Sequence, residues 1–245
     1  MGSVLYYLFL FVFTIPYFAV LCVVFLLTVA FDRERVVLHW ASRIWAMAIF
    51  RLNPCWKLKL ENGGKADGKK PWVVVVNHQS MADIPLMYVL PLKFKWVSKA
   101  EVRKWPLFGI VLYFHGDILV ERSSGKSVRR MIAKCKKHLD RGTSVIIFPE
   151  GTRSPDARMG RFHEGAFLVA KTAGMGILPV VSKGTGTMTD GWRVRMPHTF
   201  TVRVLDPVPA EEVAAAGTKE MMARVEEAMK AEYRKMCPEL YAESE

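Results

Sequence analysis

The chain opens with a long apolar segment. From Gly2 to Phe31 it carries no charged side chain, and a helix of that length would reach about 40 Å, enough to enter or cross a bilayer. Pro16 removes one helical hydrogen bond and predicts a kink. The length of the run, with no basic segment before it and no small-residue cleavage site after it, argues against a cleaved signal peptide. Aromatic residues typical of a lipid interface occur within it, namely Tyr6, Tyr7, Tyr17 and Phe18.

A second apolar segment comes after the charged stretch 32–35 and covers residues 36–52. Its tryptophans and arginines predict a helix that lies at the membrane interface or doubles back to it, with Trp40, Arg43, Trp45 and Arg51. Two arrangements fit this pattern: the first helix spans the bilayer, or both helices form a hairpin in one leaflet. Basic residues after the first run favour the cytoplasmic face for the rest of the chain. The sequence therefore predicts a two-helix anchor over residues 1–52 that holds the protein to the cell membrane from the cytoplasmic side.

From residue 53 onward, short apolar runs alternate with longer amphipathic ones. Trp56, Leu58 and Leu60 alternate with lysines, as expected of a half-buried strand. Other runs typical of strands cover residues 72–76, 94–97, 118–120, 145–148, 177–181 and 200–205, and helical patterns cover 127–140 and 219–233. Strands separated by helices predict an α/β domain over residues 53–245, built on a mixed, largely parallel sheet flanked by helices.

Composition and charge narrow the range of partners. Hydrophobic residues make up 51% of the 245 residues and the mean hydropathy is +0.14, which indicates that part of the surface faces lipid. A net charge of +12, from 35 basic and 23 acidic residues, indicates an anionic partner: nucleic acid, an anionic membrane or a phosphorylated substrate. The cysteines have neither metal-binding nor redox spacing and are expected to be free thiols in a reducing compartment: Cys22, Cys55, Cys135 and Cys237.

A polar segment directly after the buried run 73–76 is the first candidate for chemistry. Residues 77–85 have the sequence NHQSMADIP, and Pro85 favours a helix that begins near Asp83, with His78 on the loop before it. That loop can fold His78 back toward Asp83, and a carboxylate on one imidazole nitrogen fixes the tautomer and raises the basicity of the other. A helix-capping Asp83 and an unremarkable loop histidine are the alternative. The position of His78 at the carboxyl end of a strand favours a ligand site.

A second polar turn comes after the run 145–148 and has the sequence PEGTRS over residues 149–154. Gly151 permits a close backbone approach, and Arg153 offers a planar fork that suits a phosphate. A structural turn with a surface arginine explains the same residues. Lys99 and Arg122 also lie at predicted strand ends, where solvated surface side chains are the alternative.

Taken together, these segments resemble the glycerolipid acyltransferases, the family typified by 1-acyl-sn-glycerol-3-phosphate acyltransferase. His78 and Asp83 match that family's His-x4-Asp signature, and residues 116–122, 148–154 and 177–180 are similar to its second, third and fourth blocks, in order. The second block departs from the family pattern, because Leu119-Val120-Glu121 stands where a Phe-Ile-Asp type of sequence is frequent. The resemblance covers roughly residues 72–181.

The resemblance implies transfer of a fatty acyl group from acyl carrier protein or coenzyme A to the sn-2 hydroxyl of lysophosphatidic acid, giving phosphatidic acid. It makes His78 the general base and Asp83 the residue that orients it. Backbone N–H groups near Gly151 are candidates to stabilise the oxyanion. The substrate-binding set that it implies, with the arginines and lysine on the acceptor phosphate, is Lys99, Arg122, Glu150, Gly151, Thr152 and Arg153.

No metal or cofactor is expected beyond the acyl thioester, since His78, His115 and His163 lack a zinc spacing. Ser80 is a rival nucleophile, but no G-x-S-x-G elbow surrounds it. Other possibilities are a different acceptor, such as another lysophospholipid or glycerol 3-phosphate, and a thioester or lipid hydrolase. A basic nucleic-acid-binding or membrane-scaffold protein would explain the charge but not the polar strand ends. The expected partners are therefore the bilayer, a lysophospholipid and an acyl thioester, without nucleic acid.

Overall fold

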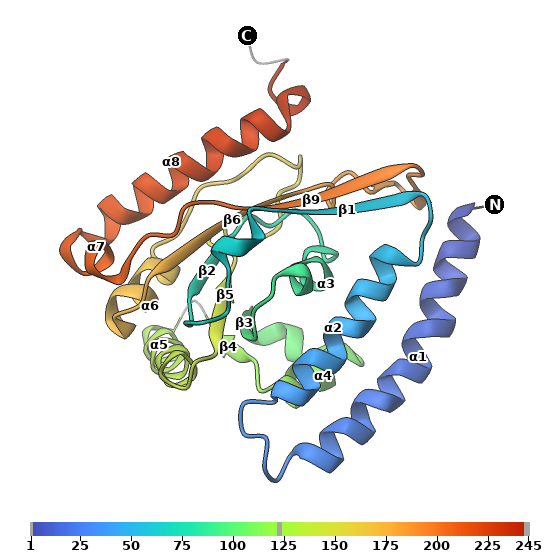
Figure 1. Ribbon diagram of the computed structural model, residues 1–245, viewed down its shortest axis with the longest axis horizontal. Helices are drawn as coiled ribbons and strands as arrows, with labels where there is room; N and C mark the ends of the chain where they lie inside the picture. The colour runs from blue at the N-terminus through green and yellow to red at the C-terminus, as the bar shows by residue number, and fades with distance from the viewer. Residues whose placement is uncertain (1, 122–123, 243–245) are drawn as a thin grey trace.

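A seven-stranded sheet forms the centre of the computed structural model, which describes residues 2–121 and 124–242 (Figure 1). The strand order is β1-β9-β6-β2-β5-β3-β4. Neighbours from β6 to β4 are parallel, β9 is antiparallel to β6, and β1 is parallel to β9. The strands are β1 (Trp56–Glu61), β2 (Val73–Val76), β3 (Phe94–Lys99), β4 (Ile118–Val120), β5 (Ser144–Ile147), β6 (Ile177–Lys183) and β9 (His198–Val204), with β7 (Thr189–Asp190) and β8 (Arg193–Val194) as a separate pair.

Helices cover both faces of this sheet. Figure 1 places α1 to α4 on one side and α5 to α8 on the other. Their bounds are α1 (Gly2–Thr28), α2 (Val36–Arg51), α3 (Asp83–Leu86), α4 (Phe108–His115), α5 (Gly125–Asp140), α6 (Gly165–Ala173), α7 (Ala210–Ala215) and α8 (Thr218–Met236). Short 3-10 turns occupy Gly63–Lys65, Met87–Val89, Ala100–Lys104 and Pro238–Leu240. The predicted fold class, a mixed and largely parallel sheet flanked by helices, is confirmed.

Strand β2 shows why the sheet needs both layers. All its residues are valines with no exposed surface, and they alternate between two apolar clusters: Val73 and Val75 face α5, α6 and α8, while Val74 and Val76 face α2 and α3. A central parallel strand is apolar on both sides for this reason. The edge strand β1 differs, because Trp56 is buried while Lys57 and Lys59 are exposed, and its alternating sequence predicted that arrangement.

The N-terminal helices lie side by side along the α/β domain (Figure 1). Among the described helices, α1 alone is long and apolar enough to cross a membrane, judged by length and composition. The 16-residue α2 doubles back along it and buries Ala46 and Phe50 in the same cluster as Val74. The inner side of α2 is therefore part of the core beside the sheet.

Contacts hold both ends of α1 to the domain. Near its beginning, the backbone N–H of Val194 donates to Ser3 Oγ at 2.9 Å, and the Tyr6 ring lies 4.7 Å from that of Trp56. Near its end, Phe25 stacks on Phe114 with ring centroids 4.2 Å apart. The first helix thus runs along the surface of the domain rather than away from it.

The loop after α1 is fastened to α5 through Glu34. Its carboxylate lies 2.6 Å from His138 Nδ1 and accepts from Arg141 Nη1 at 2.9 Å, and its backbone carbonyl accepts from the buried Lys95. Burial raises the pKa of Glu34, but the bonds from His138 and Arg141 outweigh it and the pKa is lowered. The ionised Glu34 carboxylate therefore stabilises the fold at pH values above its ordinary pKa of 4.5. This stabilisation is lost as the pH falls through the lowered pKa and the carboxylate takes up a proton.

Candidate active site

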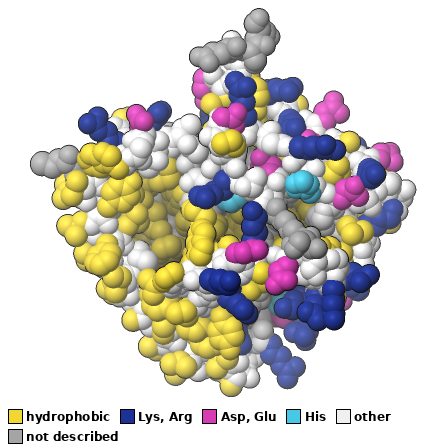
Figure 2. All heavy atoms as spheres, turned by 180° about the vertical axis from the view of Figure 1, so that it is seen from behind, with side chains coloured by type: hydrophobic (Ala, Val, Ile, Leu, Met, Phe, Trp, Pro, Cys, Tyr) yellow, Lys and Arg dark blue, Asp and Glu magenta, His cyan; other side chains and the backbone are white. Residues whose placement is uncertain are grey.

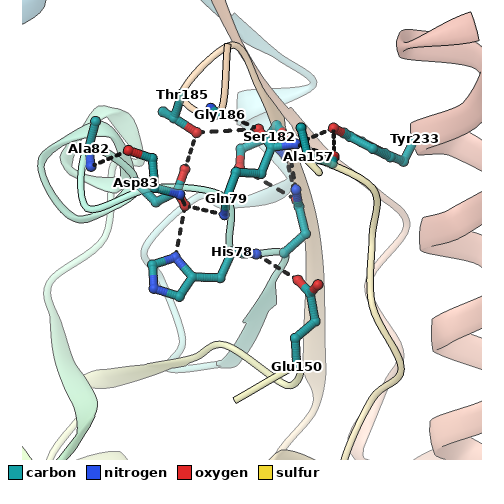
Figure 3. Close-up of polar contacts among 12 residues, drawn as sticks. His78, Gln79, Ala82, Asp83, Glu150, Ala157, Ser182, Thr185, Gly186 and Tyr233 are labelled. Atoms are coloured by element: carbon teal, nitrogen blue, oxygen red, sulfur yellow. Dashed lines mark hydrogen bonds and ion pairs between the residues drawn. The ribbon is translucent and has the colours of Figure 1, made fainter. Parts of the chain in front are cut away.

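The loop between β2 and α3 brings His78 and Asp83 together (Figure 3). Helix α3 begins at Asp83, as the proline two residues later predicted. His78 Nδ1 lies 2.8 Å from Asp83 Oδ2; the Asp83 side chain is fully buried, and the His78 side chain is 12% exposed. An aspartate at Nδ1 places the ring proton there, so Nε2 carries the lone pair. No described group is hydrogen bonded to Nε2, which leaves it able to accept a proton from a substrate.

Asp83 is held by more than its histidine. The same oxygen, Oδ2, accepts from the backbone N–H groups of Gln79 at 2.6 Å and Ser80 at 2.8 Å. The other oxygen, Oδ1, accepts from the hydroxyl of Thr185, a buried residue just beyond the end of β6. A buried carboxylate is stable only when such donors replace water. These bonds also fix the direction in which it faces the imidazole.

Glu150 fastens the second predicted segment to the first. Its carboxylate accepts from the His78 backbone N–H at 2.7 Å and from that of Gly160 at 2.6 Å. Burial raises the pKa of Glu150, and the two backbone donors oppose that shift. The His78 carbonyl in turn accepts from the Ser154 N–H at 2.9 Å. Glu150 therefore shapes the loop that carries the histidine; whether it also contacts substrate stays a prediction.

An aromatic stack supports the imidazole from one side. The His78 ring lies parallel to Phe148, with centroids 3.9 Å apart, and Phe148 stacks on Trp96 at 5.3 Å. Phe148 comes directly after the last residue of β5, and Trp96 lies in β3. Their sequence positions indicated strands, but nothing in them indicated that they form a platform under the histidine.

A buried amide beside the histidine links the loop to the last long helix. Gln79 Nε2 bonds to Tyr233 of α8 and donates to the Ala157 carbonyl at 3.0 Å, while Gln79 Oε1 accepts from Thr185 at 3.3 Å (Figure 3). The Asn77 amide exchanges bonds of 2.9 and 2.8 Å with the backbone of Ser182, which ties the ends of β2 and β6. Sequence reasoning found Gln79 and Asn77 only as parts of a motif and missed Thr185 and Tyr233. Because β6 ends beside β2, the polar residues after it were the available signal for Thr185.

Of the cations predicted to bind the acceptor phosphate, the structure describes Lys99 and Arg153. Arg153 and Thr152 are exposed on the turn after Gly151, whose φ of +71° is the left-handed conformation that favours glycine. Lys99 is exposed at the end of β3, the strand beside β5. Within the described residues, neither Lys99 nor Arg153 has an acidic partner. Arg122 lies outside the described residues.

The structure also shows which backbone N–H groups near Gly151 are already hydrogen bonded within the turn. The Gly151 N–H donates to the Phe148 carbonyl at 3.1 Å and is used by the turn itself. The N–H groups of Thr152 and Arg153 have no partner among the described residues, so they are the remaining candidates for an oxyanion on this turn.

Within the described residues, neither Ser80 nor His115 is hydrogen bonded to His78 or Asp83 through its side chain. Ser80 Oγ accepts from the Ala82 N–H at 3.3 Å and makes no bond to His78. His115 is buried beside Ser42, 2.8 Å away. Within the part of the chain that the structure describes, no group of histidine, cysteine and acidic residues could hold a metal ion. The geometry favours His78 acting directly on a substrate rather than through a serine nucleophile.

A histidine oriented by a buried carboxylate, with its outer nitrogen open, is an arrangement that can take a proton from a substrate hydroxyl or from water. A family model described as Acyltransferase matches residues 57–183, more than half of the chain, and the chain belongs to that family.

Individual relatives agree with this membership. The chain is 33% identical to a 1-acyl-sn-glycerol-3-phosphate acyltransferase of Chlamydomonas reinhardtii, over 76% of this chain and 56% of that protein. It is 36% identical to a lyso-ornithine lipid O-acyltransferase of Pseudomonas aeruginosa, over 60% and 53% respectively. The chain thus spans about half the length of these two relatives. The crystal structure of the LPA acyltransferase PlsC from Thermotoga maritima shares the fold, with a TM-score of 0.76, 23% identity and coverage of 96% of this chain and 94% of that one.

We predict that the Thr185 hydroxyl is required to orient Asp83. Thr185→Val keeps the shape but removes the donor to Oδ1, and a bond to a buried charge contributes about 1.5–3 kcal/mol, equivalent to roughly 10- to 100-fold in rate. The kcat of acyl transfer should fall by that factor with little change in KM. Thr185→Ser, which restores the hydroxyl, should recover most of the kcat. Equal activity of the valine and serine variants would contradict this role.

Proposed function

We propose that the protein transfers a fatty acyl group from an acyl thioester to the sn-2 hydroxyl of lysophosphatidic acid, giving phosphatidic acid, with His78 as general base and Asp83 as its orienting residue. The observation that carries this is the 2.8 Å contact between His78 Nδ1 and the fully buried Asp83 carboxylate. Membership of the Acyltransferase family and the named activity of the Chlamydomonas relative support it.

The chemistry depends on the open nitrogen. A hydroxyl is a weak nucleophile near neutral pH and needs a base. His78 Nε2 accepts the hydroxyl proton while the acceptor oxygen forms a bond to the thioester carbonyl carbon. The carbon–sulfur bond then breaks, and the imidazolium gives the proton to the leaving thiolate, which departs as the free thiol and restores neutral His78. Asp83 stabilises that imidazolium without taking the proton. No acyl-enzyme is needed, in keeping with the separation of Ser80 from the histidine.

The cations near the turn suit the phosphate of this acceptor. Arg153 lies on the same turn as Glu150, which bonds to the His78 backbone, and Lys99 ends the strand beside β5. We assign the phosphate to these side chains together with Arg122, because a guanidinium binds two phosphate oxygens at once.

A second acceptor class is supported by the Pseudomonas relative, which is named for a lyso-ornithine lipid rather than a phosphate-bearing one. The same base could serve any lipid hydroxyl that reaches Nε2. The two acceptors differ in the need for phosphate-binding cations, and this difference separates them experimentally.

We further propose that α1 lies within one leaflet, on the cytoplasmic face of the cell membrane. Its outward surface is strongly apolar, with exposed Leu8, Phe11, Ile15, Leu26 and Leu27. Figure 2 shows hydrophobic side chains massed on the side where Figure 1 places α1. Both ends of α1 contact the α/β domain. If α1 instead crossed the bilayer, one of its ends would have to move away from the domain and those contacts would be lost.

The function is tested by product analysis with purified protein, an acyl thioester and a panel of acceptors. Lysophosphatidic acid should yield phosphatidic acid, with thiol released only when acceptor is present. His78→Ala should reduce turnover by at least 100-fold while the protein still folds and unfolds cooperatively, since it removes the base. Thiol release that does not depend on acceptor would instead indicate a hydrolase.

Arg153→Ala tests the acceptor. With lysophosphatidic acid, its KM should rise about tenfold through loss of a charge-assisted bond, with kcat little changed. The KM for lyso-ornithine lipid should be unaffected, and Lys219→Ala on α8 serves as a matched charge control. If wild-type protein prefers the ornithine acceptor, or Arg153→Ala leaves the lysophosphatidic acid KM unchanged, the phosphate assignment is wrong.

The membrane-facing surface is tested by placing charge on it. Phe11→Glu with Ile15→Glu should lower binding to phospholipid vesicles at least tenfold, since a charge in the hydrocarbon region costs about 2.5 kcal/mol or more per residue. Ala231→Glu, on the exposed side of α8, should bind vesicles as wild type does. Unchanged vesicle binding by the α1 variant would show that another surface contacts the bilayer.

A further inference from the structure

Helix α5 carries exposed cations that have no acidic partner among the described residues. Lys126, Arg129, Arg130, Lys134 and Lys137 are all exposed, and none lies within ion-pair distance of a described acidic side chain. The single acidic residue of the helix, Asp140, pairs with Lys136 at 2.9 Å. On its inner side, the helix buries Met131, Cys135 and Leu139.

These cations are arranged unfavourably for an isolated helix. Lys126, Arg130 and Lys134 are spaced at intervals of four residues, which makes them neighbours along one stripe that repel one another. The first turn has no acidic residue, so positive charge also sits at the positive end of the helix dipole. In helix α8, by contrast, a lysine has an acidic partner one turn away: Lys230 pairs with Glu226 at 2.6 Å. An anion bound along the α5 stripe would relieve both costs.

The stripe begins at the same edge of the sheet as the candidate active site. Strands β2, β5, β3 and β4 are parallel, and α5 starts just after β4 ends, so its first turns lie at the edge that carries His78. Figure 1 shows α5 across the sheet from α1, and Figure 2 shows basic side chains gathered on the side away from the massed hydrophobic ones. Among the described residues, only the last turn of α5 contacts the loop after α1, through His138 and Arg141, and Lys126 lies about 18 Å along the helix axis from His138, so the stripe begins at the end of α5 that is farther from the anchor.

We propose that the α5 stripe docks an acidic carrier protein that presents the acyl group as a thioester. This inference rests on the proposed function and names the acyl donor for it. The stripe from residue 126 to 134 is about 12 Å long and lies on an exposed helix surface. Two cavities among the described residues, of about 420 and 640 Å³, are lined by residues outside α5, so neither of them lies along the stripe. A long, open, cationic surface fits an acidic protein helix better than the compact phosphates of coenzyme A, and charge complementarity of this kind guides docking.

The test compares one acyl chain on two carriers. Arg130→Glu should raise the KM for acyl-loaded acyl carrier protein at least tenfold at low salt, leave kcat unchanged, and leave the KM for the same acyl group on coenzyme A within twofold. Added salt should raise the wild-type KM for the carrier-borne donor. The difference in this KM between wild type and Arg130→Glu should therefore become smaller. Lys219→Glu, an equal charge change at an exposed position of α8, should leave both KM values as in wild type.

Direct titration of the carrier protein onto wild type and Arg130→Glu supplies a second measurement that does not require turnover. Equal affinities, equal rises in both KM values, or use of the coenzyme A donor alone would overturn the docking site while leaving the transferase intact. Loss of binding to anionic vesicles with an unchanged carrier KM would assign the stripe to the membrane and would likewise overturn the proposal. Absence of transfer from both donors by wild type would instead refute the proposed function.

Discussion

The arrangement of the site depends on one buried negative charge. The Asp83 side chain has no exposed surface, so its carboxylate is stable only because donors from the loop and from the end of β6 surround it. Those donors come from segments about a hundred residues apart, which means that the loop, the sheet edge and the segment after β6 must all be in place before His78 is oriented. Fold and chemistry are therefore coupled at this carboxylate.

Exposed apolar side chains and exposed cations occupy different helices on the surface. The exposed apolar side chains of α1 and the exposed cations of α5 belong to helices on opposite faces of the sheet. Under the proposed function, the water-insoluble acceptor and the soluble donor would approach the same histidine from different sides. Helix α5, with six basic residues and one acidic residue, contributes +5 of the net charge of +12, and this share is placed where the proposed donor would need it.

Much of the fold, and the contact between His78 and Asp83, could be predicted because both depend on local signals. Apolar runs marked the strands of the main sheet, and Pro85 located the start of α3. Helix α4 was not identified, because its sequence is apolar on every side and lacks helical periodicity. Phe148, Trp96, Thr185 and Tyr233 were not assigned to the site, since their roles arise only when separate strand ends meet.

The bond between Gln79 and Tyr233 joins residues 154 positions apart, so the loop beside the base is supported only after helix α8 has been synthesised. During synthesis, the apolar first helix emerges long before that closing helix exists. Under the proposed function, a nascent chain would therefore meet lipid through α1 while the loop that carries His78 still lacks its bond to Tyr233.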